Sequence, residues 1–491
     1  MTAGSVAANL GGVALFALPG LGLAELLAPL RRLPLPRRLG YAYLLGVLAL
    51  AGSLFAASHL FGASLRRPAI VLLAVVPIVL GLGARAWRWR RRGPAAPVPV
   101  PGRAQRGRRQ RILAVLALAA IIGICLGPLA SALCAPLADW DGRMTWGPLA
   151  AYLRHEGTVD AAVLRDAHWW VFHPRYPPLV PLAQVMVQEA FGAGEDEQLY
   201  RAFYVAFWVA LLLVLYDGAR RAAGPRAATL ATLCAALPPF LSFGGGGATS
   251  AYSDMALAAF YGAALVLLLL EPPSLPGGLA AGCLLAGAVL TKNEGALLAG
   301  AVLLLAALRL LRRLRQQKAG SGARSLGWLA TAAAPVLAAV VLLASWRAAI
   351  PNRDDEDYFA VLHVFELVRG AFARLPVIVP LVLRWTFRWS DWLGFWSVFL
   401  VVMIAGHRFL QRPVARRMLV AGLIPAAIGW AAYAVSTRLT DIVGETWERF
   451  LLQGLVPLAI AFACALGHLL RRSGLLSPHP RPPTREPYFL K

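Results

Sequence analysis

The stretch RILAVLALAAIIGICLGPLASALCAPLADWDGR, residues 111–143, decides the fold. From Ile112 to Cys134 its only ionisable side chains are those of Cys125 and Cys134. As a helix it is long enough to cross the ~30 Å hydrocarbon layer of a bilayer. Two carboxylates, Asp139 and Asp141, follow within a few residues. The stretch therefore predicts a membrane-crossing helix that presents carboxylates as soon as it reaches the surface.

The rest of the chain repeats this apolar pattern. It has 491 residues, of which 59% are hydrophobic, and a mean hydropathy of +0.63. These values favour an all-α polytopic membrane protein over a soluble enzyme. We expect about 13 transmembrane helices, in a range of roughly 11 to 14. The expected spans are 6–30, 39–64, 68–86, 112–134, 200–216, 226–243, 250–270, 275–290, 294–311, 326–346, 391–408, 418–437 and 449–470.

Charge gives the orientation of these spans. The net charge is +24, and nearly all of the positive charge is arginine in clusters between spans. A basic chain can bind nucleic acid, but clusters at the ends of apolar spans are typical of cytoplasmic flanks, and we expect no nucleic acid partner. All the clusters share one side if 177–193 and 373–389 do not cross the membrane. Most carboxylates then lie outside, which indicates a multi-pass protein of the inner or plasma membrane with its chemistry on the outer face.

We expect four regions along the chain. Residues 1–111 contain N-terminal transmembrane helices and a basic cytoplasmic linker, and 112–310 form a catalytic transmembrane module with a large outer loop at 135–199. Residues 311–470 contain C-terminal helices and a second outer loop at 347–390. Residues 471–491 form a disordered cytoplasmic tail, because their composition cannot form a core.

The Asp139-Trp140-Asp141 motif is the first candidate for chemistry. A carboxylate near an apolar medium has a raised proton affinity unless a cation is close, and Arg143 is the nearest cation in sequence. Such a carboxylate can act as a general base on a hydroxyl group. The alternative is a helix cap at the membrane surface, with Trp140 and Trp146 as interfacial anchors.

The second candidate is HPRYPPL, in which His173, Arg175 and Tyr176 precede two prolines. The prolines impose extended backbone and then a helix start, which presents the polar side chains at the membrane surface. Arg175 can bind a phosphate group. The alternative is a structured turn in contact with lipid headgroups. The histidines lack the spacing of a zinc motif, and we expect no metal ligands.

Three further motifs place charge at the outer ends of spans. YSDMAL contains Asp254, LTKNEG contains Lys292 and Glu294, and ERFLLQ contains Arg449. Ionisable groups at such depth are costly, which makes them functional candidates. Each also has a structural alternative: a helix cap for Asp254, a tight turn for Lys292 and Glu294, and pairing with Glu445 or Glu448 for Arg449.

Together these motifs resemble the GT-C superfamily of membrane glycosyltransferases, in particular bacterial relatives of the protein O-mannosyltransferases and lipid A aminoarabinose transferases. The resemblance runs from about Ile112 to Leu310. The elements that carry it are the DWD motif, HPRYPPLVPL, the arginine Arg201 that opens the next helix, YSDMAL and LTKNEG. Beyond them the chain fits in hydropathy and in the ERFLLQGLVPLA segment. LTKNEG departs from the family's Thr-Lys-Gly-Pro element.

The resemblance implies transfer of a sugar, with inversion, from a polyprenyl-phosphate donor to a hydroxyl on a glycan, lipid or protein at the outer face. It assigns the base to Asp141, with Asp139 as the alternative. Arg175, Arg201, Lys292 and Arg449 are then candidates for the donor phosphate, and His173, Tyr176, Asp254 and Glu294 for substrate contacts. A monophosphate leaving group needs cations, so no cofactor is expected, although a divalent metal is compatible with a diphosphate donor.

Two other classes of function fit the same sequence. A transporter or flippase of envelope precursors would also be polytopic, but such proteins often carry internal repeats, and none is evident here. A non-catalytic membrane partner in envelope assembly would have the same helices but degenerate motifs. Group transfer without solute transport separates the enzyme from both.

Overall fold

The structure is a computed structural model that describes residues 3–92, 108–166, 173–194, 196–316, 322–351, 369, 372–436 and 439–473. Every regular element in this part of the chain is helical. Parts of the expected linker and the expected tail beyond residue 473 lie outside the described residues, as does the acidic run at 352–357.

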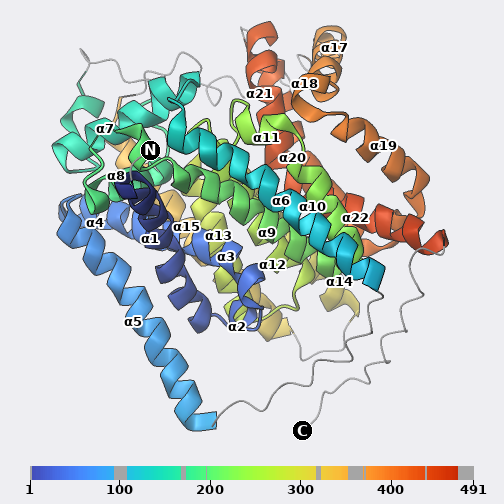
Figure 1. The fold of residues 1–491 in the computed structure, drawn as a ribbon, viewed down its shortest axis with the longest axis horizontal. Coiled ribbons are helices and arrows are strands. Elements are labelled where there is room, and N and C mark those ends of the chain that lie inside the picture. Colours follow the sequence, from blue (N-terminus) through green and yellow to red (C-terminus); the bar gives the residue numbers. More distant parts are fainter. Residues whose placement is uncertain are drawn as a thin grey trace.

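The N-terminal half forms helices that lie side by side (Figure 1). A π-helical turn joins α3 to α4, so that these two elements make one long helix. The elements are α1 (Ala3–Leu26), α2 (Ala28–Arg31), α3 (Leu35–Val47), η1 (Leu48–Gly52), α4 (Ser53–Phe61), α5 (Arg67–Arg92), α6 (Arg108–Cys134), η2 (Gly142–Trp146), α7 (Gly147–Glu156), η3 (Ala162–Leu164), α8 (Leu179–Phe191), η4 (Glu197–Leu199) and α9 (Ala202–Ala223).

The second half completes the bundle. Prolines at the first positions start several of these helices, where a missing backbone N–H costs nothing. The elements are α10 (Pro225–Ala236), α11 (Pro239–Phe243), α12 (Asp254–Leu270), α13 (Leu275–Thr291), α14 (Glu294–Gln316), α15 (Gly322–Ala348), α17 (Leu375–Thr386), α18 (Trp389–Trp392), α19 (Phe395–Ala405), η5 (His407–Gln411), α20 (Pro413–Val435), α21 (Leu439–Gln453) and α22 (Leu455–Arg472).

Nine helices among the described residues are long and apolar enough to cross a membrane, which supports an all-α, multi-pass membrane protein. Four of the expected spans, 226–243, 250–270, 275–290 and 391–408, correspond to shorter helices. Pro238 and Pro239 divide the first of them into α10 and α11, because proline cannot continue a helix. The exact number of crossings stays a prediction.

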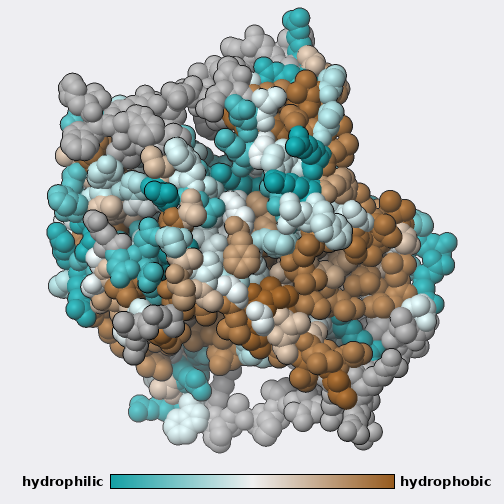
Figure 2. Space-filling view, turned by 45° about the horizontal axis from the view of Figure 1, so that its top comes forward, coloured by the Kyte–Doolittle hydropathy of each residue, from teal (hydrophilic) through white to brown (hydrophobic). Residues whose placement is uncertain are grey.

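Burial separates an interior layer from an outer one. Every residue of α12 except Leu270 is buried, and α12 packs against α9 and α13. By contrast, α5 and α6 leave long apolar side chains exposed along their length, as a lipid-facing helix does. Figure 2 shows hydrophobic residues over a broad area at the lower right of one face and hydrophilic residues toward its top and left.

The segment 177–193 is not a lipid-facing span, as expected. Its helix α8 has only 13 residues, and nearly all of them are buried within the protein. The helix starts directly after Pro177 and Pro178 and ends at Gly192, whose φ of +64° suits a residue without a Cβ. The helix α17, within 373–389, is also too short to span a bilayer.

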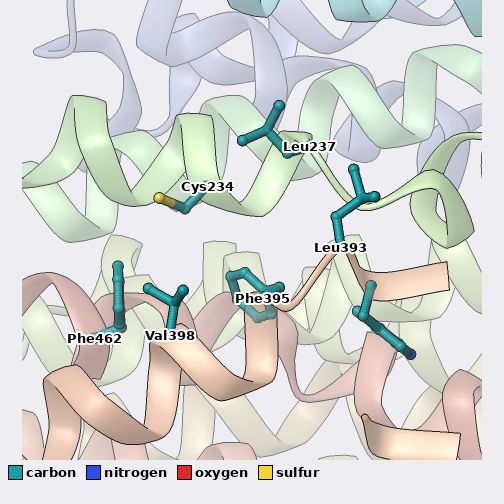
Figure 3. A pocket seen from close by; sticks show the side chains of 7 residues that line it. Cys234, Leu237, Leu393, Phe395, Val398 and Phe462 are labelled. Carbon is teal, nitrogen blue, oxygen red and sulfur yellow. The ribbon is translucent and has the colours of Figure 1, made fainter. Parts of the chain in front are cut away.

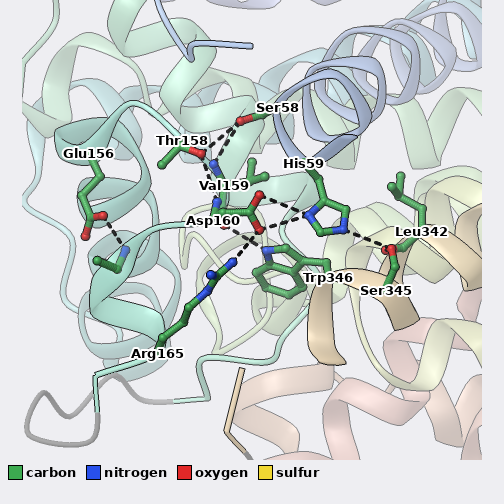
Figure 4. Close-up of polar contacts among 11 residues, drawn as sticks. Ser58, His59, Glu156, Thr158, Val159, Asp160, Arg165, Leu342, Ser345 and Trp346 are labelled. Atoms are coloured by element: carbon green, nitrogen blue, oxygen red, sulfur yellow. Dashed lines mark hydrogen bonds and ion pairs between the residues drawn. The ribbon is translucent and has the colours of Figure 1, made fainter. Parts of the chain in front are cut away.

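A set of polar contacts fixes the loop at 157–160 to the helices around it (Figure 4). His59 of α4 contacts the Asp160 carboxylate through Nδ1 at 3.0 Å and the Ser345 hydroxyl of α15 through Nε2 at 3.1 Å. The Trp346 indole donates to the Val159 carbonyl at 2.9 Å, and the Val159 N–H donates to Ser58. The loop at 157–160 therefore joins two helices that are far apart in sequence.

Candidate active site

The carboxylate of Asp141 meets a cation from the far end of the chain. Arg449 Nη1 of α21 donates to Asp141 Oδ2 at 2.6 Å, and both side chains are largely buried. Arg143, the nearest cation in sequence, is exposed instead. The contact brings together the two ends of the candidate region, the DWD motif and the ERFLLQ segment.

Close backbone packing holds Asp141 in this place. A Cβ on Gly142 would come within 2.3 Å of the Ser250 carbonyl oxygen, so that only glycine lets the turn approach the loop before α12. From the same loop, the Tyr252 hydroxyl accepts a hydrogen bond from the Asp141 N–H at 3.0 Å. The position of the carboxylate is therefore set by the loop 247–252.

The glycine run after α11 passes beside Arg449. Gly246 has a φ of +99°, and a Cβ added to it would lie 3.4 Å from side-chain carbons of both Arg449 and Asp254. The Arg449 guanidinium also lies 4.6 Å from the centre of the Tyr252 ring, within the range of a cation–π contact. The glycine run thus brings backbone close to the Arg449 side chain, and the structure gives the run a packing role.

Asp254 and Lys292 form a buried ion pair close to Arg449. Lys292 Nζ lies 2.9 Å from Asp254 Oδ1, and the Gln453 amide donates to the same oxygen at 3.1 Å. Asp254 is 1% exposed and Lys292 is 7% exposed. Glu294 lies 3.2 Å from the same Nζ. The second carboxyl oxygen of Asp254 is buried without a hydrogen-bond partner, so it can accept a bond from a ligand.

Asp139 differs from Asp141 in its surroundings. The described part of the chain supplies no ion pair to Asp139, although Arg201 and Arg449 are close enough to act on it electrostatically. Burial raises the pKa of the Asp139 carboxyl above its usual range, and this effect exceeds the opposite influence of the two arginines. A raised proton affinity suits a carboxylate that accepts a proton as a general base.

Arg201 lies beside this group but donates to backbone. Its guanidinium donates to the carbonyls of Ala135 and Thr249, the second at 3.1 Å, and the side chain is 3% exposed. These bonds tie the end of α6 to the loop before α12. The predicted phosphate contact of Arg201 would have to compete with them, and it stays a prediction.

The HPRY segment forms one wall of the group. The His173 ring stacks on Tyr176 at 4.5 Å, and Tyr176 packs on Trp146 at 5.3 Å. Tyr176 is also close enough to Lys292 to act on it electrostatically. The Arg175 carbonyl accepts from Arg347 Nε at 2.8 Å, while Arg175 Nε is buried without a hydrogen-bond partner.

The structure thus brings most of the predicted residues to one cluster and adds three that we did not predict. Tyr252 and Gln453 lie inside motifs already quoted, and Gln453 follows Arg449 by four residues, which is one helical turn. Arg347, at the end of α15, contacts Arg175 and Asn293. The only feature of the sequence that could have indicated Arg347 is its charge at the end of an apolar span.

Two other features do not add chemistry to this cluster. Among the described residues, no group of three or more His, Cys, Asp or Glu side chains is placed to hold a metal ion. A pocket of about 100 Å³ lies between α10, α19 and α22, lined by Cys234, Leu237, Leu393, Phe395, Val398, Phe462 and Trp392 (Figure 3). Its lining is largely apolar, and it offers no charged group to a reacting centre.

No family model, curated protein or solved structure matches the chain. The geometry alone therefore describes what the cluster can do. It places one carboxylate of raised pKa, Asp139, close to the ion pair of Asp141 and Arg449, and Arg449 is in turn close to the buried pair of Asp254 and Lys292. Such an arrangement can accept a proton and stabilise a developing negative charge.

Proposed function

We propose that the protein is a membrane glycosyltransferase of the GT-C type that uses a polyprenyl-phosphate sugar. The acceptor hydroxyl belongs to a glycan, lipid or protein on the outer face of the membrane. The observation that carries the proposal is the contact of Asp141 with Arg449, close to Asp139 and to the buried Asp254–Lys292 pair. A base and buried cations are the groups that such a transfer needs.

In the proposed reaction, the acceptor oxygen attacks C1 of the sugar and forms the new glycosidic bond. The bond from C1 to the phosphate oxygen breaks, and its electron pair leaves with the polyprenyl phosphate. The hydroxyl proton passes to Asp139. We assign the base to Asp139 and not to Asp141, because burial raises the pKa of the Asp139 carboxyl and because Asp141 Oδ2 already accepts a hydrogen bond from Arg449.

Cations at the site have the complementary task. Lys292 is buried, Arg449 is largely shielded from water, and Arg175 has a buried Nε without a hydrogen-bond partner. Charge that develops on the leaving phosphate is stabilised most by preorganised donors shielded from water. Lys292 and Arg449 are already paired with carboxylates, so the phosphate would share these cations with Asp254 and Asp141.

The test is transfer of label from synthetic polyprenyl-phosphate sugars to cell-envelope acceptors by the purified full chain. We expect transfer that is unaffected by EDTA and is lost in Asp139→Asn. Asp166→Asn, a carboxylate of the same outer loop outside the cluster, is the matched control and should retain transfer. Transfer that survives in Asp139→Asn with Asp141→Asn would reject the base assignment, and solute transport without transfer would reject the enzyme.

A further inference from the structure

A second charged cluster lies at the C-terminal end of α22, whereas the candidate active site lies near the N-terminal end of that helix. Arg471 and Arg472 end α22, while Arg408 lies in η5 and Arg412 directly before α20. All four are close enough to His468 to act on it electrostatically. We call these four arginines with His468 the inner basic cluster. Since α22 has 18 residues, its ends are about 27 Å apart, which is close to the thickness of the hydrocarbon layer.

Tight packing brings these elements together. Both η5 and α20 pack against α22, and a Cβ on Gly406 would come within 3.1 Å of the Ala465 carbonyl oxygen. The end of α19 therefore passes close to α22, and η5 follows beside the last turns of that helix. The arginines come from two segments of the sequence, 408–412 and 471–472.

The inner basic cluster lacks a counter-charge within the described residues. No ion pair involves any of its four arginines in this part of the chain, whereas the inner-end arginines Arg37, Arg38, Arg88 and Arg221 all pair with carboxylates. Two of its nitrogens, Arg471 Nη2 and His468 Nε2, are also buried without a hydrogen-bond partner. Buried polar nitrogens are nearly always satisfied, so this pair points to a ligand.

The surroundings indicate what that ligand is. Ile404, three residues before η5, is 71% exposed, and Leu410, within η5, is 37% exposed. Apolar surface therefore adjoins the arginines of the inner basic cluster. A free phosphate ion would match the charge alone. A lipid matches both, because its headgroup phosphate can accept from the arginines while its chains cover the apolar side chains.

We propose that the inner basic cluster binds the phosphate of an anionic lipid headgroup, between η5 and the end of α22. The arginines act as donors to the phosphate oxygens, and Arg471 Nη2 gains the acceptor that it lacks within the protein. The proposal does not depend on the glycosyltransferase assignment, since the cluster lies about one helix length from Gln453 at the candidate active site.

Native mass spectrometry of the full chain in a neutral detergent tests the proposal. The probes are phosphatidylglycerol and phosphatidylcholine with identical acyl chains. We expect phosphatidylglycerol to bind at least about tenfold more tightly, and the quadruple variant R408Q/R412Q/R471Q/R472Q to lose that preference. The matched control R32Q/R90Q/R312Q/R315Q removes the same charge from other basic segments and should keep it.

Three outcomes would overturn the proposal. They are equal binding of the two lipids, an equal loss of preference in both quadruple variants, and displacement of the bound lipid by inorganic phosphate, which would assign the site to a free anion. The variant R408K/R412K/R471K/R472K provides a second measurement if the glutamine variant does not fold. It keeps the charge and should retain part of the preference, and a complete loss would contradict binding by charge.

Discussion

Arg449 and Asp141 are separated by 308 residues and meet at 2.6 Å. The pair connects the turn that follows α6 to α21, the helix that precedes α22. Its second contact, between Arg449 and the Tyr252 ring, connects the same point to the loop before α12. Three distant segments therefore depend on one guanidinium, and its removal should affect both structure and activity.

A double-mutant cycle measures this dependence. Arg449→Gln and Asp141→Asn should each destabilise the protein, and together they should cost less than the sum. We expect a coupling of about 1–3 kcal/mol in the free energy of unfolding, because both side chains are largely shielded from water. Thermal unfolding in detergent provides the measurement. Additive effects would mean that the two charges do not interact in the folded state.

The Asp254–Lys292 pair should be more sensitive to the loss of one partner. Lys292→Met leaves a buried carboxylate without its cation and should cost about 3–5 kcal/mol. Adding Asp254→Asn should recover part of that loss, since the uncompensated charge disappears. Arg165→Met removes an exposed partner of Asp160 and should change stability by less than about 1 kcal/mol. Equal shifts in melting temperature for Lys292→Met and Arg165→Met would contradict the buried pair.

Gly142 gives a steric test of the site. Gly142→Ala places a Cβ against the Ser250 carbonyl oxygen, so the turn must move away and carry Asp141 with it. We expect at least about a tenfold loss of transfer activity, because small displacements of catalytic groups are costly. Gly123→Ala is the control: nothing lies within 4 Å of a Cβ there, and the helix should gain up to about 1 kcal/mol.

Glu448 predicts a pH-dependent stability. Burial, followed by the nearby Asp391 carboxylate, raises the pKa of Glu448 from 4.5 to about 8, while Trp392 Nε1 donates to its carboxyl at 2.9 Å. The folded state then holds one proton more than the unfolded state between these values, so the contribution of Glu448 to stability is fully present below 4.5 and is lost as the pH rises toward 8. Melting temperatures across this window should decline in the wild type relative to Glu448→Gln. Parallel profiles would show that Glu448 does not titrate in this way.

Asp139 predicts a pH-dependent rate. A base must be ionised, so transfer should decline as the pH falls through the pKa of Asp139. Because burial raises that pKa, the decline should begin at a higher pH than for an ordinary aspartate, near 3.9. The pH profile of transfer at limiting donor reports this value. A rate that is constant down to the pH at which the protein unfolds would exclude a titrating carboxylate as the base.

The helical class and most helix positions were predictable from the sequence, because hydropathy reports directly on the cost of placing polar groups in lipid. The broken segment at 226–243 was not. Its apolar composition is continuous, and hydropathy does not distinguish a crossing helix from two short buried ones. The prolines at 238 and 239 were the available signal.

The candidate residues were largely predictable one by one, since ionisable groups at the ends of apolar runs stand out. Their pairing was not predictable. Arg143 was the natural partner of Asp141 by proximity in sequence, and Glu445 or Glu448 that of Arg449. In the structure Asp141 instead pairs with Arg449, and the Glu448 carboxyl accepts a hydrogen bond from Trp392. Such contacts are set by helix packing, which single-sequence patterns do not encode.

The distance in sequence between Asp141 and Arg449 also bears on biosynthesis. A ribosome makes the chain from the N-terminus, so the DWD motif is inserted long before α21 is made. Until α21 arrives, Asp141 has no partner and the loop before α12 lacks the cation that packs on Tyr252. The nascent protein therefore carries an incomplete candidate site, and the proposed transfer requires nearly the whole chain to have been synthesised.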